Sequence, residues 1–149
     1  MDPSGYDAGK KTKGRKRHIL VDTLGLMLDV VVHPADVQDR DGAHTLLREV
    51  RRRFPFVERI YADGGYQGPK MAAVVAATGS WKLEIVKRSD AAGFNVLPKR
   101  WIVERTFAWI GNCRRLARDF ERHAAKVVAF IRLAMIRIML RRLTATPCS

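Results

Sequence analysis

The order of apolar runs constrains the fold of this chain more than any other feature. Two short runs rich in β-branched residues, 19–21 and 26–32, are separated by a polar tetrapeptide that ends in Gly25. This pattern predicts a β-hairpin, because glycine tolerates the positive φ angle of a tight turn. Residues 39–53 then place apolar side chains at the spacing of an amphipathic helix, and either Asp39 or Asp41 is expected to cap it.

The rest of the chain continues to alternate between strand and helix patterns. Further strands are predicted at 57–62 and 81–86, a short helix at 71–77, a loop at 89–98, and two C-terminal helices at 99–122 and 124–143. This order predicts an α/β fold in which helices flank a mixed sheet.

The charge of the chain points to a polyanionic partner. The formal net charge is +13, from 28 Lys and Arg against 15 Asp and Glu. An excess of this size favours a phosphate backbone, although charge alone does not separate DNA binding from an RNA-associated structural role or an anionic membrane surface. Arginines interrupt the apolar segment 127–143, which argues against a membrane span, and we expect a cytoplasmic, nucleoid-associated protein.

Asp63 is the first candidate for chemistry. It follows a predicted strand and precedes Gly64 and Gly65, so a phosphate or a metal ion could approach the backbone without meeting a β-carbon. The alternative is a structural turn aspartate, since Asp-Gly pairs are common in turns.

Glu104 is the second candidate. The predicted helix 99–122 has a buried stripe and, mostly opposite it, a glutamate followed by arginines with small residues between them. The expected stripe is Ile102, Thr106, Trp109, Cys113, Leu116 and Phe120. A solvated face with an Arg100–Glu104 ion pair is the alternative interpretation.

Both candidates lie in segments that resemble the DDE transposases of bacterial insertion sequences. The matching segments are 5–11, 14–22, 61–66 and 101–109. The resemblance implies an RNase H-like catalytic domain in which three carboxylates bind two Mg²⁺ or Mn²⁺ ions that clamp the scissile phosphate. It assigns Asp63 and Glu104 as metal ligands and catalytic residues, and Arg100 as a residue that orients Glu104 or contacts a phosphate.

The sequence departs from the family pattern at several positions. A tyrosine and a lysine usual in the family are replaced by Leu97 and Gly111, and Arg114 or Arg115 is the expected substitute for the phosphate contact. The first catalytic aspartate of the family lies on a central strand that we do not find. We therefore expect the C-terminal part of a transposase, missing its first central strand and inactive alone. It is either a truncated copy or the second half of a split coding unit, which an upstream fragment would complete.

The expected organisation is a flexible basic leader at 1–17, the catalytic domain at 18–143 and a tail at 144–149. The predicted function is metal-dependent cleavage of DNA at insertion-element ends and strand transfer into target DNA, by a dimer on DNA. A non-catalytic DNA-binding remnant or regulator of the intact transposase is the alternative. The residues predicted to bind DNA are Lys10, Lys11, Lys13, Arg15, Lys16, Arg17, Arg105, Arg114, Arg115 and Arg118.

Overall fold

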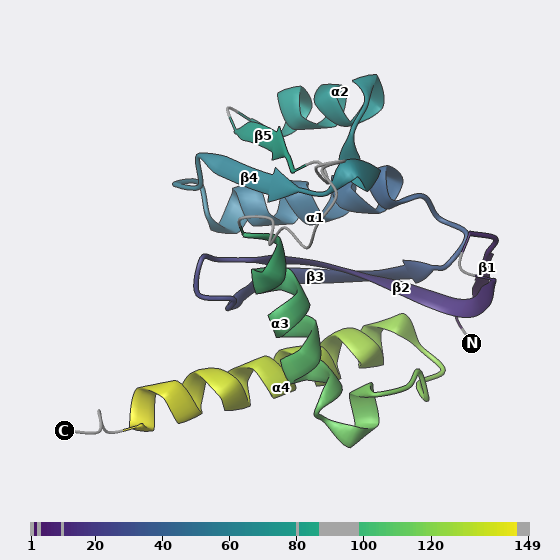
Figure 1. The fold of residues 1–149 in the computed structure, drawn as a ribbon, viewed down its shortest axis with the longest axis vertical. Coiled ribbons are helices and arrows are strands. Elements are labelled where there is room, and N and C mark those ends of the chain that lie inside the picture. Colours follow the sequence, from purple (N-terminus) through teal and green to yellow (C-terminus); the bar gives the residue numbers. More distant parts are fainter. Residues whose placement is uncertain (1, 3, 10, 80, 87–98, 146–149) are drawn as a thin grey trace, which may run out of the picture.

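A computed structural model describes residues 2, 4–9, 11–79, 81–86 and 99–145 of the chain. Strands and helices alternate as expected for a mixed α/β fold, and Figure 1 shows helices on both sides of the strands. In chain order the elements are β1 (Gly5–Asp7), β2 (Thr12–Val21), β3 (Met27–Pro34), α1 (Asp39–Arg53), β4 (Arg59–Ala62), η1 (Gly64–Tyr66), α2 (Pro69–Thr78), β5 (Lys82–Ile85), α3 (Arg100–Gly111), η2 (Arg114–Leu116) and α4 (Ala124–Thr144).

The predicted hairpin is present as the antiparallel pair β2 and β3. Its turn is held by Asp22, whose Oδ1 accepts hydrogen bonds from the backbone N–H groups of Leu24 and Leu26, each at 2.8 Å. Gly25 has a φ of +81°, the left-handed conformation that the sequence predicted for the turn. A β-carbon there would also lie 2.9 Å from Thr106 Oγ1, so close packing against α3 excludes larger residues.

The N-terminal segment differs from the flexible leader expected over residues 1–17. Residues 5–7 form β1, which pairs antiparallel with the first residues of β2. The basic run therefore continues into a ten-residue strand rather than a mobile arm. The prediction of a flexible leader relied on the lack of hydrophobic periodicity in this segment. A strand still forms, because hydrogen bonding between backbones does not need apolar side chains. Lys10 lies outside the described residues.

Helix α1 begins and ends where the sequence predicted, but its cap differs. The N-cap residue is Gln38, without a side-chain hydrogen bond, and both Asp39 and Asp41 lie inside the first turn. There they still interact favourably with the positive end of the helix dipole. The face with Leu46, Leu47 and Val50 is buried, as the periodicity required.

The segment after α1 returns to form a second, two-stranded sheet. Strands β4 and β5 pair in parallel and form a sheet separate from β1-β2-β3. Helix α2 connects them, as expected for a parallel pair, and packs against α1. The residues 87–98, which include the predicted loop and Leu97, lie outside the described part of the chain.

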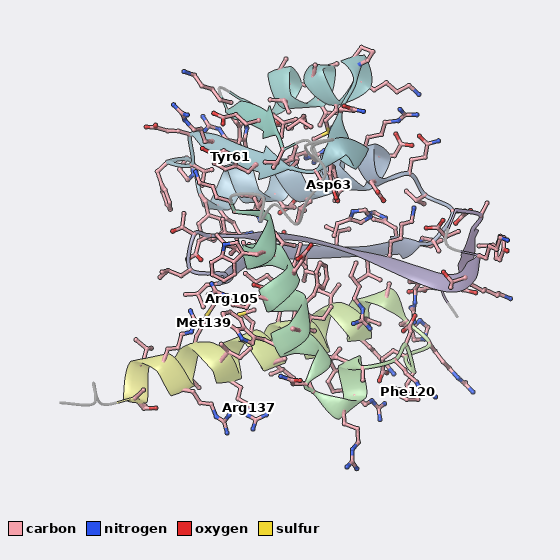
Figure 2. The ribbon with its side chains drawn as sticks, viewed as in Figure 1. Tyr61, Asp63, Arg105, Phe120, Arg137 and Met139 are labelled. Carbon is pink, nitrogen blue, oxygen red and sulfur yellow. The ribbon has the colours of Figure 1, made fainter. Side chains whose placement is uncertain are left out.

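Helix α3 is much shorter than the helix predicted at 99–122. It ends at Gly111, and the turn η2 follows. The helical spacing beyond Gly111 is therefore lost, and Phe120, expected in the buried stripe, is 58% exposed (Figure 2). Ile102, Thr106 and Leu116 of that stripe are buried as predicted.

Two apolar clusters lie on opposite faces of the hairpin. Val31 packs towards the cluster that holds α1, α2 and β4, whereas Val30 and Val32 pack against Val127 and Ile131 of α4. The alternation of side chains along β3 thus supplies both cores. In the described residues, none of the helices is long and apolar enough to cross a membrane.

Candidate functional site

Asp63 and Glu104 line the same cavity although 41 positions separate them in the sequence. The cavity has a volume of about 450 Å³ and lies where β2, β4 and α3 approach one another. Figure 1 shows α3 running from beside β4 across β2 and β3 towards α4. Helix α3 is thus the element that brings the glutamate to the end of β4, where the aspartate lies.

Asp63 has a defined local geometry. It is the N-cap of η1, and its Oδ1 accepts a hydrogen bond from Gly65 N at 3.0 Å. The carboxylate is exposed and takes no other hydrogen bond from the described residues. The structural alternative predicted such a cap, and it is present, but its hydrogen bond engages only the Oδ1 atom of the carboxylate.

Glu104 is positioned by the anchoring of α3. Two residues along, Thr106 is fully buried and its hydroxyl donates to Gly25 O at 2.8 Å. This bond joins α3 to the β2–β3 turn and leaves Glu104 on the exposed side of the helix. Arg100 begins α3, but its side chain is not among those that the structure describes.

Lys99 and Tyr61 are cavity residues that the sequence interpretation missed. The Lys99 ammonium lies 3.7 Å from the centre of the Tyr61 ring, a cation–π contact. The hydrogen bond from Lys99 lowers the pKa of the Tyr61 phenol, with a smaller contribution from Arg59. Lys99 adopts a left-handed backbone conformation with a φ of +70°, which is uncommon for a lysine and was not detectable from residue spacing.

His18 and Tyr66 form a second unexpected pair in the wall of the cavity. His18 is 4% exposed, and its Nδ1 lies 2.9 Å from the Tyr66 hydroxyl. Burial lowers the pKa of His18 and raises the pKa of Tyr66, so both side chains are uncharged at neutral pH. The histidines showed no metal-ligand spacing in the sequence, and this one acts as a buried hydrogen-bonding group.

A second cavity of about 510 Å³ adjoins the first. The two share Asp63, and the lining of the second includes Lys13, Arg15, Lys16 and Arg17 from β2. The same cavity is also lined by Asp7, Asp39, Asp63 and Asp119, so it brings basic and acidic side chains together beside β2.

Several residues predicted to bind DNA are engaged within the protein. Arg15 pairs with Asp119 at 2.7 Å, and Lys16 lies 3.4 Å from Asp39 and 3.6 Å from Asp7. Desolvation lowers the pKa of the half-buried Arg17, whose guanidinium donates to Leu116 O.

Helix α3 and the loop after it hold the remaining predicted contacts. Arg105 stacks between Trp101 and Trp109 and donates to Leu24 O at 2.9 Å. Arg115 pairs with Glu121 at 2.6 Å. In the part of the chain that the structure describes, the predicted contacts that are exposed and without an ion pair are Lys11, Lys13, Arg114 and Arg118.

The described residues gather no group of three or more Asp, Glu, His or Cys side chains that could hold a metal ion. Two carboxylates do lie on either side of Gly65. A β-carbon there would lie 3.0 Å from Asp39 Oδ2 and 3.2 Å from Asp63 Oδ1, so this glycine separates two carboxylates. A side chain at this position would push them apart.

Comparison of the sequence with known proteins gave two matches. The model of the family described as "Transposase DDE domain" matches residues 1–139. A protein of Burkholderia cepacia, named as a transposase for insertion sequence element IS402, is 32% identical over 127 residues, which cover 80% of this chain and 60% of that relative. The chain thus spans about 60% of the length of the curated relative it matches. No solved structure is significantly similar to it. The chain belongs to the DDE-domain transposase family.

Proposed function

We propose that this chain takes part in DNA transposition, by metal-dependent cleavage at insertion-element ends and transfer of the cut strand into target DNA. The observation that carries the proposal is the shared cavity of Asp63 and Glu104, which Arg17 and Lys99 also line. A carboxylate pair beside cations fits a phosphodiester substrate, because the cations attract the strand and the carboxylates hold the metal.

Asp63 and Glu104 are the residues that would hold Mg²⁺ or Mn²⁺. Their oxygen atoms suit these hard cations, and Mg²⁺ is often bound by one or two carboxylates, with water and substrate phosphate completing its shell. When bound, the ion would activate the attacking oxygen and stabilise the leaving oxygen. The Gly65 N–H orients Asp63, and the buried Thr106 anchor orients the helix of Glu104.

The cationic groups of the cavity would position the scissile strand. Lys99 lies at its rim, held over Tyr61, and Arg17 lines both cavities. Arg114 and Arg115, the substitutes considered for a family lysine, do not line the cavity, so Lys99 is the better-placed phosphate contact. Arg100 remains a prediction as the residue that orients Glu104.

A third carboxylate would reach the site on an added strand. Two strand edges have no strand partner among the described residues. One is the edge of β2 beyond the residues that pair with β1, and the other is the edge of β4 that does not pair with β5. Both strands line the 450 Å³ cavity, largely with apolar side chains such as Ile19, Leu20 and Ile60. An extended segment placed there would join the two sheets into one RNase H-like mixed sheet. An upstream fragment of the transposase is the proposed source, and a dimer on DNA remains a prediction.

The absence of a three-residue metal cluster in the described residues favours one second candidate, a DNA-binding regulator without catalytic activity. Titration with Mn²⁺, followed by electron paramagnetic resonance, separates the two functions. We expect weak Mn²⁺ binding that Asp63→Asn and Glu104→Gln each abolish, whereas Asp41→Asn, an exposed aspartate on α1, leaves it unchanged.

Cleavage assays on element-end DNA complete the test. The chain alone should bind DNA without cutting it, and cutting should appear when an upstream fragment that carries an aspartate is added. Asp63→Asn should abolish that cutting and leave DNA binding unchanged or tighter, because a negative charge is removed. Mn²⁺ binding that survives both substitutions would refute the assigned site and favour the regulator.

A further inference from the structure

A third cavity, of about 380 Å³, lies between the end of α3 and the C-terminal half of α4. It shares no lining residue with the two cavities at Asp63. Figure 2 shows Arg137 of α4 at the opposite side of the molecule from Tyr61 and Asp63. The cavity is therefore separate from the candidate catalytic site.

Three arginines line this cavity: Arg137, Arg141 and Arg142. Arg137 and Arg141 are one helical turn apart and so share a face of α4. Arg142 is held in place, with its guanidinium 4.5 Å from the centre of the Trp109 ring and within 3.3 Å of Leu24 O. Among the described residues that line the cavity there is no carboxylate.

The arginines are not explained by the stability of α4. Basic residues in the last turn of a helix interact with its negative end, which accounts for Arg141 and Arg142. Arg137 lies two turns before that end, where the dipole effect has faded. Within the described residues neither Arg137 nor Arg141 has an ion-pair partner, and like charges around one cavity repel each other.

We propose that this cavity is a phosphate-binding site. Guanidinium groups bind phosphate oxygens with two parallel hydrogen bonds, and the exposed Asn112 at the rim can add an amide donor. The volume suits a single nucleotide unit, since small-ligand pockets begin at about 300 Å³. The phosphate belongs either to a DNA backbone or to a free nucleotide, and the site acts whether or not Asp63 and Glu104 cleave DNA.

The salt dependence of DNA binding tests the first source. Fluorescence anisotropy of a labelled duplex is measured over a range of salt concentrations for the wild type and for Arg137→Gln/Arg141→Gln. The logarithm of the DNA association constant falls linearly with the logarithm of the salt concentration, and each lost phosphate contact makes this slope less steep by about 0.9. The double variant should therefore make it less steep by about 2. Arg48→Gln, an exposed arginine on α1, is the control and should leave the slope unchanged. Arg137→Lys/Arg141→Lys should restore most of the slope, because the charge is kept.

Thermal unfolding tests the second source with pyrophosphate and thymidine monophosphate as probes. Either probe should raise the Tm of the wild type and of Arg48→Gln but not that of the double glutamine variant, because a ligand that binds only the folded state stabilises it. A less steep salt dependence in the double glutamine variant identifies the DNA backbone as the source of the phosphate. A Tm rise seen only in proteins that keep Arg137 and Arg141 identifies a free phosphate. The proposal is wrong if the double variant matches the wild type in both measurements. Neither readout depends on cleavage, so the result is independent of the test at Asp63.

Discussion

The hydroxyl of Thr106 offers the sharpest test of how Glu104 is positioned. Thr106 has no exposed surface, and its Oγ1 donates to Gly25 O at 2.8 Å and lies 3.1 Å from Ile102 O. Gly25 is itself buried. Thr106→Val keeps the shape of the side chain and removes the donor, so the Gly25 carbonyl would lose its bond across 81 residues of sequence.

The expected cost follows from these contacts. A buried acceptor left without its partner costs about 1–3 kcal/mol, and burying a methyl group in place of the hydroxyl returns about 0.8 kcal/mol. We therefore expect Thr106→Val to lower the free energy of unfolding by about 1–2 kcal/mol. In a protein of this size each kcal/mol corresponds to about 2–4 °C in Tm.

Urea denaturation followed by circular dichroism measures this change. The midpoint should fall while the m-value stays constant, since the surface exposed on unfolding is nearly the same. Thr45→Val, an exposed threonine on α1, should shift the free energy by less than about 0.5 kcal/mol. At temperatures where Thr106→Val is folded, its Mn²⁺ affinity should also be weaker. A variant as stable as the wild type, or one with unchanged Mn²⁺ binding, refutes the anchoring argument.

Two further predictions concern the buried side chains of Asp29 and His18. Asp29 is 3% exposed and pairs with Arg53 of α1 at 2.5 Å and with Arg132 of α4 at 3.2 Å. Asp29→Asn should therefore lower the free energy of unfolding by about 2 kcal/mol. This is less than the 3–5 kcal/mol expected for a fully buried pair, because both arginines can regain water. Glu84→Gln, which breaks the exposed pair with Arg59, should cost less than about 1 kcal/mol in the same urea assay; equal costs would contradict the bridging role of Asp29. Burial lowers the pKa of His18; Asp39 opposes this effect, and His33 and Lys16 reinforce it. Because the histidine of the unfolded chain takes up a proton at a higher pH, the stability of the fold should decrease as the pH drops below about 6.5. His18→Gln should flatten that fall in urea midpoints measured across this range, and an unchanged profile would show that another group is responsible.

The elements that the sequence predicted well are those with a local signal. The β2–β3 hairpin needed only two β-rich runs and Gly25, and α1 needed only the periodicity of its apolar residues. The prediction failed where packing overrides local pattern. The long helix 99–122 is interrupted at Gly111, and β1 forms without any apolar run because its backbone pairs with β2.

The candidate site divides in the same way. Asp63 and Glu104 could be selected from the sequence because each stands in a short motif. Lys99, Tyr61, His18 and Tyr66 could not, since a cation–π contact and a buried hydrogen bond depend on side chains that meet only after folding. The same holds for Arg15 and Arg105, predicted to bind DNA and found paired with Asp119 and stacked between tryptophans.

The sequence alone indicated the α/β class and the family and selected two candidate carboxylates, because periodicity and short motifs are properties of neighbouring residues. Only the tertiary structure decided that Asp63 and Glu104 share one cavity, which arginines remain unpaired, and that a cavity lined by three arginines forms at α4. Those properties depend on distances between residues far apart in the chain. Such distances are set by the packing of α1 and α4 on opposite faces of the hairpin, which no local pattern encodes.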